Sequence, residues 1–320
     1  MPNPGTPGGS ILVVAGTHGN ERNAIWLQQQ WLSCPERLAA QGFVLEHVLG
    51  NPEAARLNRR YIDRDLNRCF EPARLADASQ QQLEVSQARA LLQRSGEQGE
   101  RPALVVFDLH STTAAMGNCL VVYGRRPADL ALAAALQQRL GLPVYLHEAD
   151  AAQTGFLVER WPCGLVIEVG PVPQGVVDHA ICRQTQLALE VGLEVLAEAA
   201  VGALRLPPQL QVHRHLASVD LPRDLAGAPA ALLHPWLQGR DWQPVRPQDP
   251  VFIDSAQHSI ALEAVLPLTV PVWPVFVGEA SYGEKGIAFS LTNKESWPSS
   301  DDWSAALSSL SSRLQRGEPL

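Results

Sequence analysis

Short apolar runs that alternate with helical patterns constrain the fold of this 320-residue chain more than any other feature. The strand-like runs cover residues 11–15, 103–109 and 164–171. Apolar residues at helical spacing occupy residues 23–32, 78–93, 128–140 and 178–204. This alternation predicts an α/β fold in which a mainly parallel or mixed sheet is flanked by helices.

The sequence changes character after Leu206, and we place a domain boundary there. Residues 209–292 are rich in Pro, Gly and short β-branched or aromatic runs. Such a composition predicts a smaller β-rich domain packed beside the first one. We therefore expect a catalytic domain over residues 1–206 and a β-rich C-terminal domain over residues 207–320.

The last segment of the chain has the spacing of a short amphipathic helix. Residues 299–320 carry apolar side chains at Trp303, Leu307, Leu310 and Leu314. This spacing predicts a terminal helix that docks on the body of the protein or on a partner subunit, which would make a homo-oligomer.

Composition limits the compartment and the partners. The chain carries a net charge of −8 and has no extended basic stripe, which argues against nucleic-acid binding. No apolar run approaches the roughly 20 residues of a membrane span, and residues 1–10 lack the features of a secretory leader. Five scattered cysteines without a CxxC pair agree with a reducing compartment. We expect a cytoplasmic protein.

Side chains that can bind a metal follow two of the apolar runs. His18 and Glu21 lie three residues apart on the turn after residues 11–15, and His110 follows the run at 103–109. Open α/β sheets hold ligands at the carboxyl ends of their strands, so the three side chains can face one cation. Two His and one Glu fit a catalytic zinc site with an open fourth position. A solvated turn is the alternative explanation of the first pair.

Two carboxylates extend this pattern. Asp108 lies two residues before His110, on one strand face with it, where it can orient the imidazole or simply cap a turn. Glu168 stands alone within the third apolar run, where an unpaired carboxylate is costly. It can meet a cation, take a proton from water as a general base, or pair with an arginine.

Residues 56–68 hold five arginines and so reverse the sign of the overall charge locally. Arginine favours bidentate pairing with carboxylate or phosphate, which fits a small anionic substrate. For Arg59 and Arg64, pairing with Asp63 and Asp65 on a solvated face is the alternative.

Taken in order, these motifs resemble the aspartoacylase and succinylglutamate desuccinylase family of zinc carboxypeptidase-like hydrolases. The similar segments span nearly the whole chain and are residues 16–21, 61–68, 107–113, 167–171, 221–224, 234–235, 241–242 and 274–282. The resemblance implies one Zn²⁺ per chain. It also implies that the zinc ligands are His18, Glu21 and His110, and that Glu168 is the proton-transferring carboxylate.

The same resemblance implies roles in substrate binding. Arg60 resembles a residue that polarises the scissile carbonyl, which needs a fixed positive charge where the oxyanion develops. Asn67 and Arg68 resemble a pair that holds a substrate carboxylate. Tyr282, from the C-terminal part, resembles a tyrosine that reaches into the pocket to contact substrate.

One departure from the family pattern concerns the substrate side chain. Members closest to the animal type carry a further arginine before the glutamate strand, where it helps to hold a second carboxylate. Residues 153–160 have no arginine at the matching place. Either Arg160 replaces it from a shifted position, or the pocket accepts amino acids with a less acidic side chain.

The expected activity is zinc-dependent deacylation of N-acyl amino acids, with N-acetyl-L-aspartate giving acetate and L-aspartate. Alternatives within the class are succinylglutamate desuccinylation and deacylation of N-acetyl aromatic amino acids. A peptide carboxypeptidase would need a more open cleft, and a small-anion binding protein would have no activity at all. His213 and His215 share a strand face, but with no third partner in view we expect no second metal site there.

Overall fold

The computed structural model describes residues 9–148, 150 and 153–318. Residues 1–8, where we expect no leader, lie outside this part. Nine of the described strands form one sheet: β1 (Ser10–Ala15), β2 (Leu45–Leu49), β3 (Ala103–Ser111), β4 (Cys119–Tyr123), β5 (Val144–His147), β6 (Cys163–Val169), β7 (Gln209–Val219), β11 (Trp273–Val275) and β12 (Phe289–Pro298). Their order is β11-β12-β7-β5-β4-β6-β3-β1-β2.

The sheet is mixed. Strands β1 and β2, β1 and β3, and β3 and β6 pair in parallel, as do β4 with β5 and β5 with β7. Strand β4 runs antiparallel to β6, and β12 runs antiparallel to both β7 and β11. Because β1, β3 and β6 are parallel, their carboxyl ends meet at one edge of the sheet.

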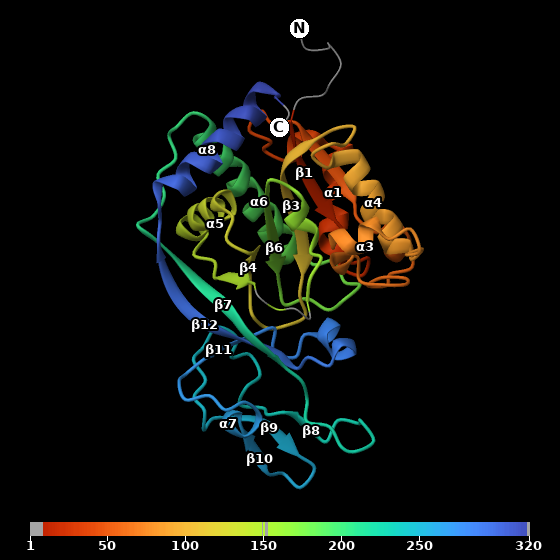
Figure 1. The fold of residues 1–320 in the computed structure, drawn as a ribbon, viewed down its shortest axis with the longest axis vertical. Helices are drawn as coiled ribbons and strands as arrows, with labels where there is room; N and C mark the ends of the chain where they lie inside the picture. Colours follow the sequence, from red (N-terminus) through yellow and green to blue (C-terminus); the bar gives the residue numbers. More distant parts are fainter. Residues whose placement is uncertain (1–8, 149, 151–152, 319–320) are drawn as a thin grey trace.

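Helices cover the body of the molecule (Figure 1). The α-helices are α1 (Arg22–Ser33), α2 (Pro52–Arg56), α3 (Pro72–Ala76), α4 (Leu83–Ser95), α5 (Pro127–Leu140), α6 (His179–Ala200), α7 (Leu262–Val265) and α8 (Asp301–Arg316). The described residues also form the 3-10 turns η1 (Pro35–Arg37), η2 (Leu66–Arg68), η3 (Leu157–Arg160) and η4 (Ala280–Lys285). Helices α1 and α5 confirm two of the predicted ranges.

The other two predicted helices were partly wrong. Helix α6 ends at Ala200 rather than near residue 204. Helix α4 begins at Leu83 rather than at residue 78. The side chain of Asp77 accepts a hydrogen bond from the Ser79 backbone N–H at 2.9 Å and so forms a turn there. The first helical N–H, that of Leu83, donates to Asp63 at 2.8 Å.

Alternating side chains of the strands build a core on each face of the sheet. On β1, Ile11 and Val13 face a core that α1, α5, α6 and α8 complete. Leu12 and Val14 face the opposite core, which α4, η2 and η3 complete. This arrangement confirms the predicted α/β sheet flanked by helices.

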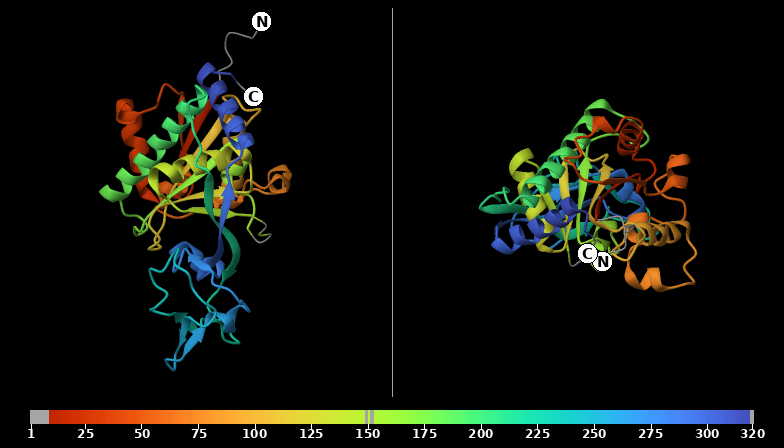
Figure 2. Two further views of the ribbon diagram at one scale, coloured as in Figure 1. Left: turned by 90° about the vertical axis from the view of Figure 1, so that its left-hand side faces the viewer. Right: turned by 90° about the horizontal axis from the view of Figure 1, so that it is seen from above.

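The C-terminal part is β-rich, as the composition predicted. A separate antiparallel sheet contains β8 (Ala231–Leu233), β9 (Pro250–Asp254) and β10 (Ser259–Ala261). It has its own small core and forms the lower lobe in the left-hand view of Figure 2. The long strands β7 and β12 run from this lobe into the main sheet.

The C-terminal helix docks on the body rather than extending away from it. Helix α8 packs on α5 and α6, and its Leu307 and Leu314 are buried in the larger core. All five cysteines are free thiols. Across the described ranges, no helix combines the length and the apolar character that would let it cross a membrane.

Candidate active site

The turn between β1 and α1 brings His18 and Glu21 to the edge of the sheet. The turn starts at Gly16, whose φ of +67° favours glycine. At Gly19 a Cβ atom would lie 2.1 Å from the carbonyl carbon of Ala54, so only glycine lets this turn pack on α2. Both His18 and Glu21 are buried. They do not lie on a solvated turn.

His110 joins this pair from the end of β3. His18 Nδ1 lies 2.6 Å from Glu21 Oε1, and His110 Nδ1 lies 3.0 Å from Glu21 Oε2. One ligand atom from each of the three side chains lies within 4.8 Å of the others. Two imidazoles and one carboxylate are side chains that can hold a metal ion, and here all three lie together in one cavity.

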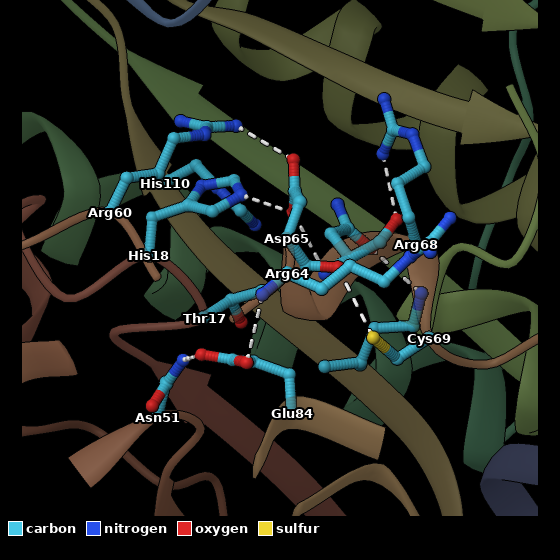
Figure 3. Close-up of polar contacts among 12 residues, drawn as sticks. Thr17, His18, Asn51, Arg60, Arg64, Asp65, Arg68, Cys69, Glu84 and His110 are labelled. Atoms are coloured by element: carbon cyan, nitrogen blue, oxygen red, sulfur yellow. Dashed lines mark hydrogen bonds and ion pairs between the residues drawn. The ribbon is translucent and has the colours of Figure 1, made fainter. Parts of the chain in front are cut away.

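The far nitrogen of each imidazole is held by a carboxylate, and the contact of His18 with Asp65 is drawn in Figure 3. His18 Nε2 lies 3.0 Å from Asp65 Oδ1. His110 Nε2 lies 2.8 Å from Asp108 Oδ2, and the Thr17 hydroxyl donates to the other oxygen of Asp108 at 2.6 Å. Such contacts place the proton on Nε2 and leave the Nδ1 lone pair for a cation. Sequence reasoning suggested Asp108 but missed Asp65.

The charges in this cluster compensate one another. Burial raises the pKa of Glu21, but the charges of His18 and His110 outweigh burial and hold that pKa well below its usual range. Burial lowers the pKa of His110, yet Asp108 and Glu21 raise it well above its ordinary value. The buried acids therefore demand positive charge, which a divalent cation can supply in place of protons.

Glu168 lies on β6, opposite His110 in the strand register. Because side chains alternate along a strand, Glu168 shares the face of the sheet that carries Asp108 and His110. Burial raises its pKa well above the ordinary value, and the neighbouring charge of Glu21 adds to this effect. A buried carboxyl with a raised pKa beside a cluster of metal-binding side chains is suited to proton transfer.

Arg60 contacts the cluster from the arginine-rich loop. Its guanidinium lies 3.2 Å from Glu21 Oε1 and 3.4 Å from Asp65 Oδ2. Asp65 is also bound by Lys285 Nζ at 2.7 Å. The alternative for Arg59 and Arg64 was pairing with Asp63 and Asp65 on a solvated face. For Asp65 that alternative is wrong, because Asp65 is buried and pairs with Arg60, Lys285 and His18.

Asn67 and Arg68 lie beside one another on η2. The Asn67 side-chain oxygen accepts a hydrogen bond from the Leu157 backbone N–H at 2.8 Å. The Arg68 guanidinium donates to Gln153 at 2.8 Å and lies 4.2 Å above the ring of Phe156. These contacts hold the arginine flat against one wall of the cavity. The contact with Gln153 was not predicted.

The C-terminal part contributes to the same cavity through η4. Tyr282 packs against Phe276, with ring centroids 5.3 Å apart, and lines the cavity with His18 and Glu168. Glu279 accepts hydrogen bonds from the backbone N–H groups of Thr113 and Ala114, at 2.8 and 3.2 Å. Glu279 thus ties the segment before η4 to the loop after β3. Only its place within the similar segment 274–282 could have identified it from sequence.

The cavity that these residues line is small, about 60 Å³. It opens beside a wider cavity of about 960 Å³, which shares Arg68 and Gln153 with it. Arg160 is exposed and is not among the lining residues, so it does not replace the missing arginine. The wall in its place is aromatic and neutral, and its members are Tyr123, Tyr145, His147, Gln153, Phe156 and Phe276.

Comparison with known proteins agrees with this geometry. Residues 7–196 match the model of the succinylglutamate desuccinylase/aspartoacylase catalytic domain, and residues 208–294 match that of the AstE/AspA barrel-sandwich hybrid domain. The chain belongs to the succinylglutamate desuccinylase/aspartoacylase family. Among curated members of this family, a protein of Parasynechococcus marenigrum named probable aspartoacylase is 57% identical over 94% of this chain and 98% of its own.

Solved structures include proteins of similar fold. Murine aminoacylase 3 is 33% identical, with a TM-score of 0.82 over 92% of this chain and 97% of that one. The succinylglutamate desuccinylase of Chromobacterium violaceum is 18% identical, with a TM-score of 0.59 over 90% of this chain and 85% of its own. The latter shows a shared fold alone. As a member of this family, the chain is a hydrolase of the acylase type.

Proposed function

We propose that this protein is a zinc-dependent amidohydrolase that deacylates N-acyl amino acids, with N-acetyl-L-aspartate as its substrate. The observation that carries the proposal is the convergence of His18, Glu21 and His110, whose ligand atoms lie within 4.8 Å of one another. Three protein ligands of this kind match a catalytic rather than a structural zinc site. Family membership supports the same reading.

In this proposal His18, Glu21 and His110 would hold one zinc ion per chain, which would supply Lewis-acid chemistry for the amide carbonyl and for water. Glu168 accepts the proton of the attacking water and returns it to the leaving nitrogen. Its raised pKa favours this exchange, because a carboxyl whose pKa lies closer to the working pH can both accept a proton from water and release it to nitrogen. Arg60 supplies a fixed positive charge where the oxyanion develops. Its Nε, buried and without a hydrogen-bond partner within the described residues, remains available as a donor.

Asn67, Arg68 and Tyr282 bind the substrate in this proposal. Arg68 is held by Gln153 and Phe156 and can offer its guanidinium to the α-carboxylate of the amino acid. Tyr282 closes the same cavity from the C-terminal part.

A second candidate is supported by the aromatic and neutral wall of the cavity. Phe156 and Tyr123 stack there with ring centroids 3.8 Å apart, and Arg160 is exposed and does not line the cavity. Such a wall favours N-acetyl amino acids with neutral or aromatic side chains. The similar murine structure is named an aminoacylase, a name that specifies no side chain, and the curated relatives are named probable aspartoacylases, which supports the first candidate.

A substrate panel distinguishes the candidates. The zinc-loaded protein is incubated with N-acetyl and N-succinyl derivatives of aspartate, glutamate, leucine, phenylalanine and tyrosine, and free amine is quantified. Fastest release from N-acetylaspartate supports the first candidate, and fastest release from the neutral or aromatic set supports the second. Preference for N-succinylglutamate would make the protein a desuccinylase. No release from any of them would leave a small-anion binding protein.

Replacing Glu168 by Gln tests the proposed base. Glutamine keeps the size of the side chain but cannot take a proton, so we expect turnover to fall on the order of 10²-fold or more. Zinc content should stay at one ion in the catalytic cluster, because Glu168 is not one of its ligands. Glu263→Gln, on the exposed side of α7, serves as the control and should keep full turnover. Equal turnover in the two variants would remove Glu168 from the mechanism.

A further inference from the structure

A second group of metal-binding side chains lies apart from the first cluster. His147 ends β5, Asp150 lies in the segment that follows, and His215 lies on the neighbouring strand β7. One ligand atom from each lies within 4.8 Å of the others. The two imidazole rings have centroids 4.7 Å apart.

The spacing within this group fits a cation better than direct hydrogen bonds. Asp150 Oδ2 lies 3.6 Å from His147 Nε2 and 3.4 Å from His215 Nε2. A good N–H···O hydrogen bond spans about 2.7–3.2 Å, so these contacts are longer than one. Ligand atoms around a tetrahedral zinc ion, each about 2.0–2.1 Å from the metal, lie about 3.4 Å from one another. The observed separations match that value.

Both imidazoles are neutral, which is the protonation state that binds metals. The Tyr145 hydroxyl lies 2.8 Å from His215 Nδ1, and a proton on that nitrogen leaves the lone pair of Nε2 free. His147 Nε2 is buried and has no hydrogen-bond partner in the described part of the chain. Burial lowers the pKa of His147 to about 3 and also lowers the pKa of His215, so both rings are neutral near pH 7.

We propose that His147, Asp150 and His215 form a second metal site, which binds a divalent transition-metal ion such as Zn²⁺ or Co²⁺. Two imidazoles and one carboxylate suit these ions, whereas Ca²⁺ and Mg²⁺ prefer sets made only of oxygen. His147 lines the small cavity, and Asp150 and His215 line the wider one. The bound ion therefore lies where the two cavities meet.

The chain offers a matched control for this site. His213 is buried on the same strand as His215, but it contacts Thr292 at 3.3 Å and packs against Trp242. It does not belong to the group of ligand atoms around Asp150. Replacing His213 therefore perturbs the same strand without removing a ligand.

Metal binding by the untagged, full-length protein tests the proposal. The metal-free protein is titrated with Co²⁺, and binding is followed by visible absorption and by equilibrium dialysis with elemental analysis. We expect two ions per chain for the wild type and for His213→Gln. We expect one ion for Asp150→Asn and for His215→Gln. The variant His18→Ala should also bind one ion, because it loses the first site and keeps the second.

Asp150 is partly exposed, so Asp150→Asn should fold even if the buried His215→Gln does not, and circular dichroism checks both. The proposal is overturned if His18→Ala, which lacks the first site, binds no ion up to about 1 mM Co²⁺. It is also overturned if folded Asp150→Asn still binds two. Neither result depends on catalytic activity, so the second site and the proposed function can fail separately.

Discussion

At the scale of single residues, carboxylates that bind no metal themselves organise the site. Asp108 and Asp65 each hold the far nitrogen of one imidazole, at 2.8 and 3.0 Å. Such partners fix the orientation and tautomer of a ligand histidine and increase its basicity. Both acids are buried, and Asp65 is in turn held by Arg60 and Lys285. The orientation of His18 and His110 therefore depends on charged side chains that do not contact the metal themselves.

Replacing Asp108 by Asn tests this dependence. Asparagine keeps an acceptor for His110 but removes the negative charge, so we expect zinc affinity to fall about 10–100-fold. Competition with a chelator of known affinity measures the change. Asp302→Asn, on the exposed side of α8, is the control and should leave zinc affinity unchanged. If both variants bind zinc equally well, Asp108 does not tune the metal.

Asp241 gives a prediction about pH and stability. Burial raises its pKa from 3.8 to about 6, although the Val277 backbone N–H donates to it at 3.0 Å. The folded protein therefore holds this proton more tightly than the unfolded chain does. The resulting stability is complete below about pH 3.8 and is lost as the pH rises through about 6. A shift of about two units corresponds to about 3 kcal/mol.

The variant Asp241→Asn removes this titration. Relative to the variant, the wild type should lose up to about 3 kcal/mol of unfolding free energy between pH 4 and pH 7. Urea unfolding of both proteins across that range provides the measurement, and all other titrations cancel in the difference. A difference that does not vary with pH would contradict the raised pKa.

Sequence could identify some of these residues but not others. His18, Glu21, His110 and Glu168 stand at the ends of apolar runs, where chain direction alone sends them to one edge of a sheet. Asp65 carries no such signal, because its partners come from remote segments of the chain. The exposure of Arg160 depends on η3, a short turn that periodicity does not reveal.

At the scale of elements, the turn between β1 and α1 determines where the metal ligands lie. Strand alternation puts Asp108 and His110 on one face, which the sequence could predict. The close packing of the turn on α2 could not be predicted, because it depends on a contact between distant backbones. The start of α4 was missed for a similar reason, since Asp63 satisfies its first N–H from outside the helix.

Replacing Gly19 by Ala tests the role of this packing. The new methyl group would lie 2.1 Å from the backbone of Ala54, so the turn must move away from α2. We expect a loss of about 1–3 kcal/mol in unfolding free energy and at least about tenfold weaker zinc binding. Thermal unfolding and chelator competition measure the two effects.

Gly283→Ala, where no atom lies within 4 Å of the added carbon, is the control for folding. Normal zinc binding by Gly19→Ala would show that the turn tolerates displacement.

At the scale of the whole molecule, the two lobes share both a sheet and a cavity. Strands β7 and β12 pair along their length, and β7 also pairs with β5 of the body. Tyr282 and Lys285 on η4 then return to the cavity and to Asp65. Composition could predict a β-rich region. It could not predict that the three strands β7, β11 and β12 extend the main sheet, because pairing between strands far apart in the sequence leaves no local sequence pattern. The domain boundary at residue 206 stays a prediction.

Metal removal gives a prediction for the whole molecule. The first cluster draws His110 from β3 and His18 and Glu21 from the turn after β1, so a bound ion joins segments that separate on unfolding. An ion that binds only the folded state adds about 2.7 kcal/mol when its concentration is about 100-fold above its Kd. For a protein of this size, chelation should lower the Tm by about 4 °C. The experiment is best made in the Asp150→Asn background, where the second proposed site is absent. In that background, calorimetry should show the full decrease in Tm on chelation. Adding the His18→Ala substitution should abolish this decrease. A shift that survives in the double variant would mean that zinc stabilises the protein elsewhere.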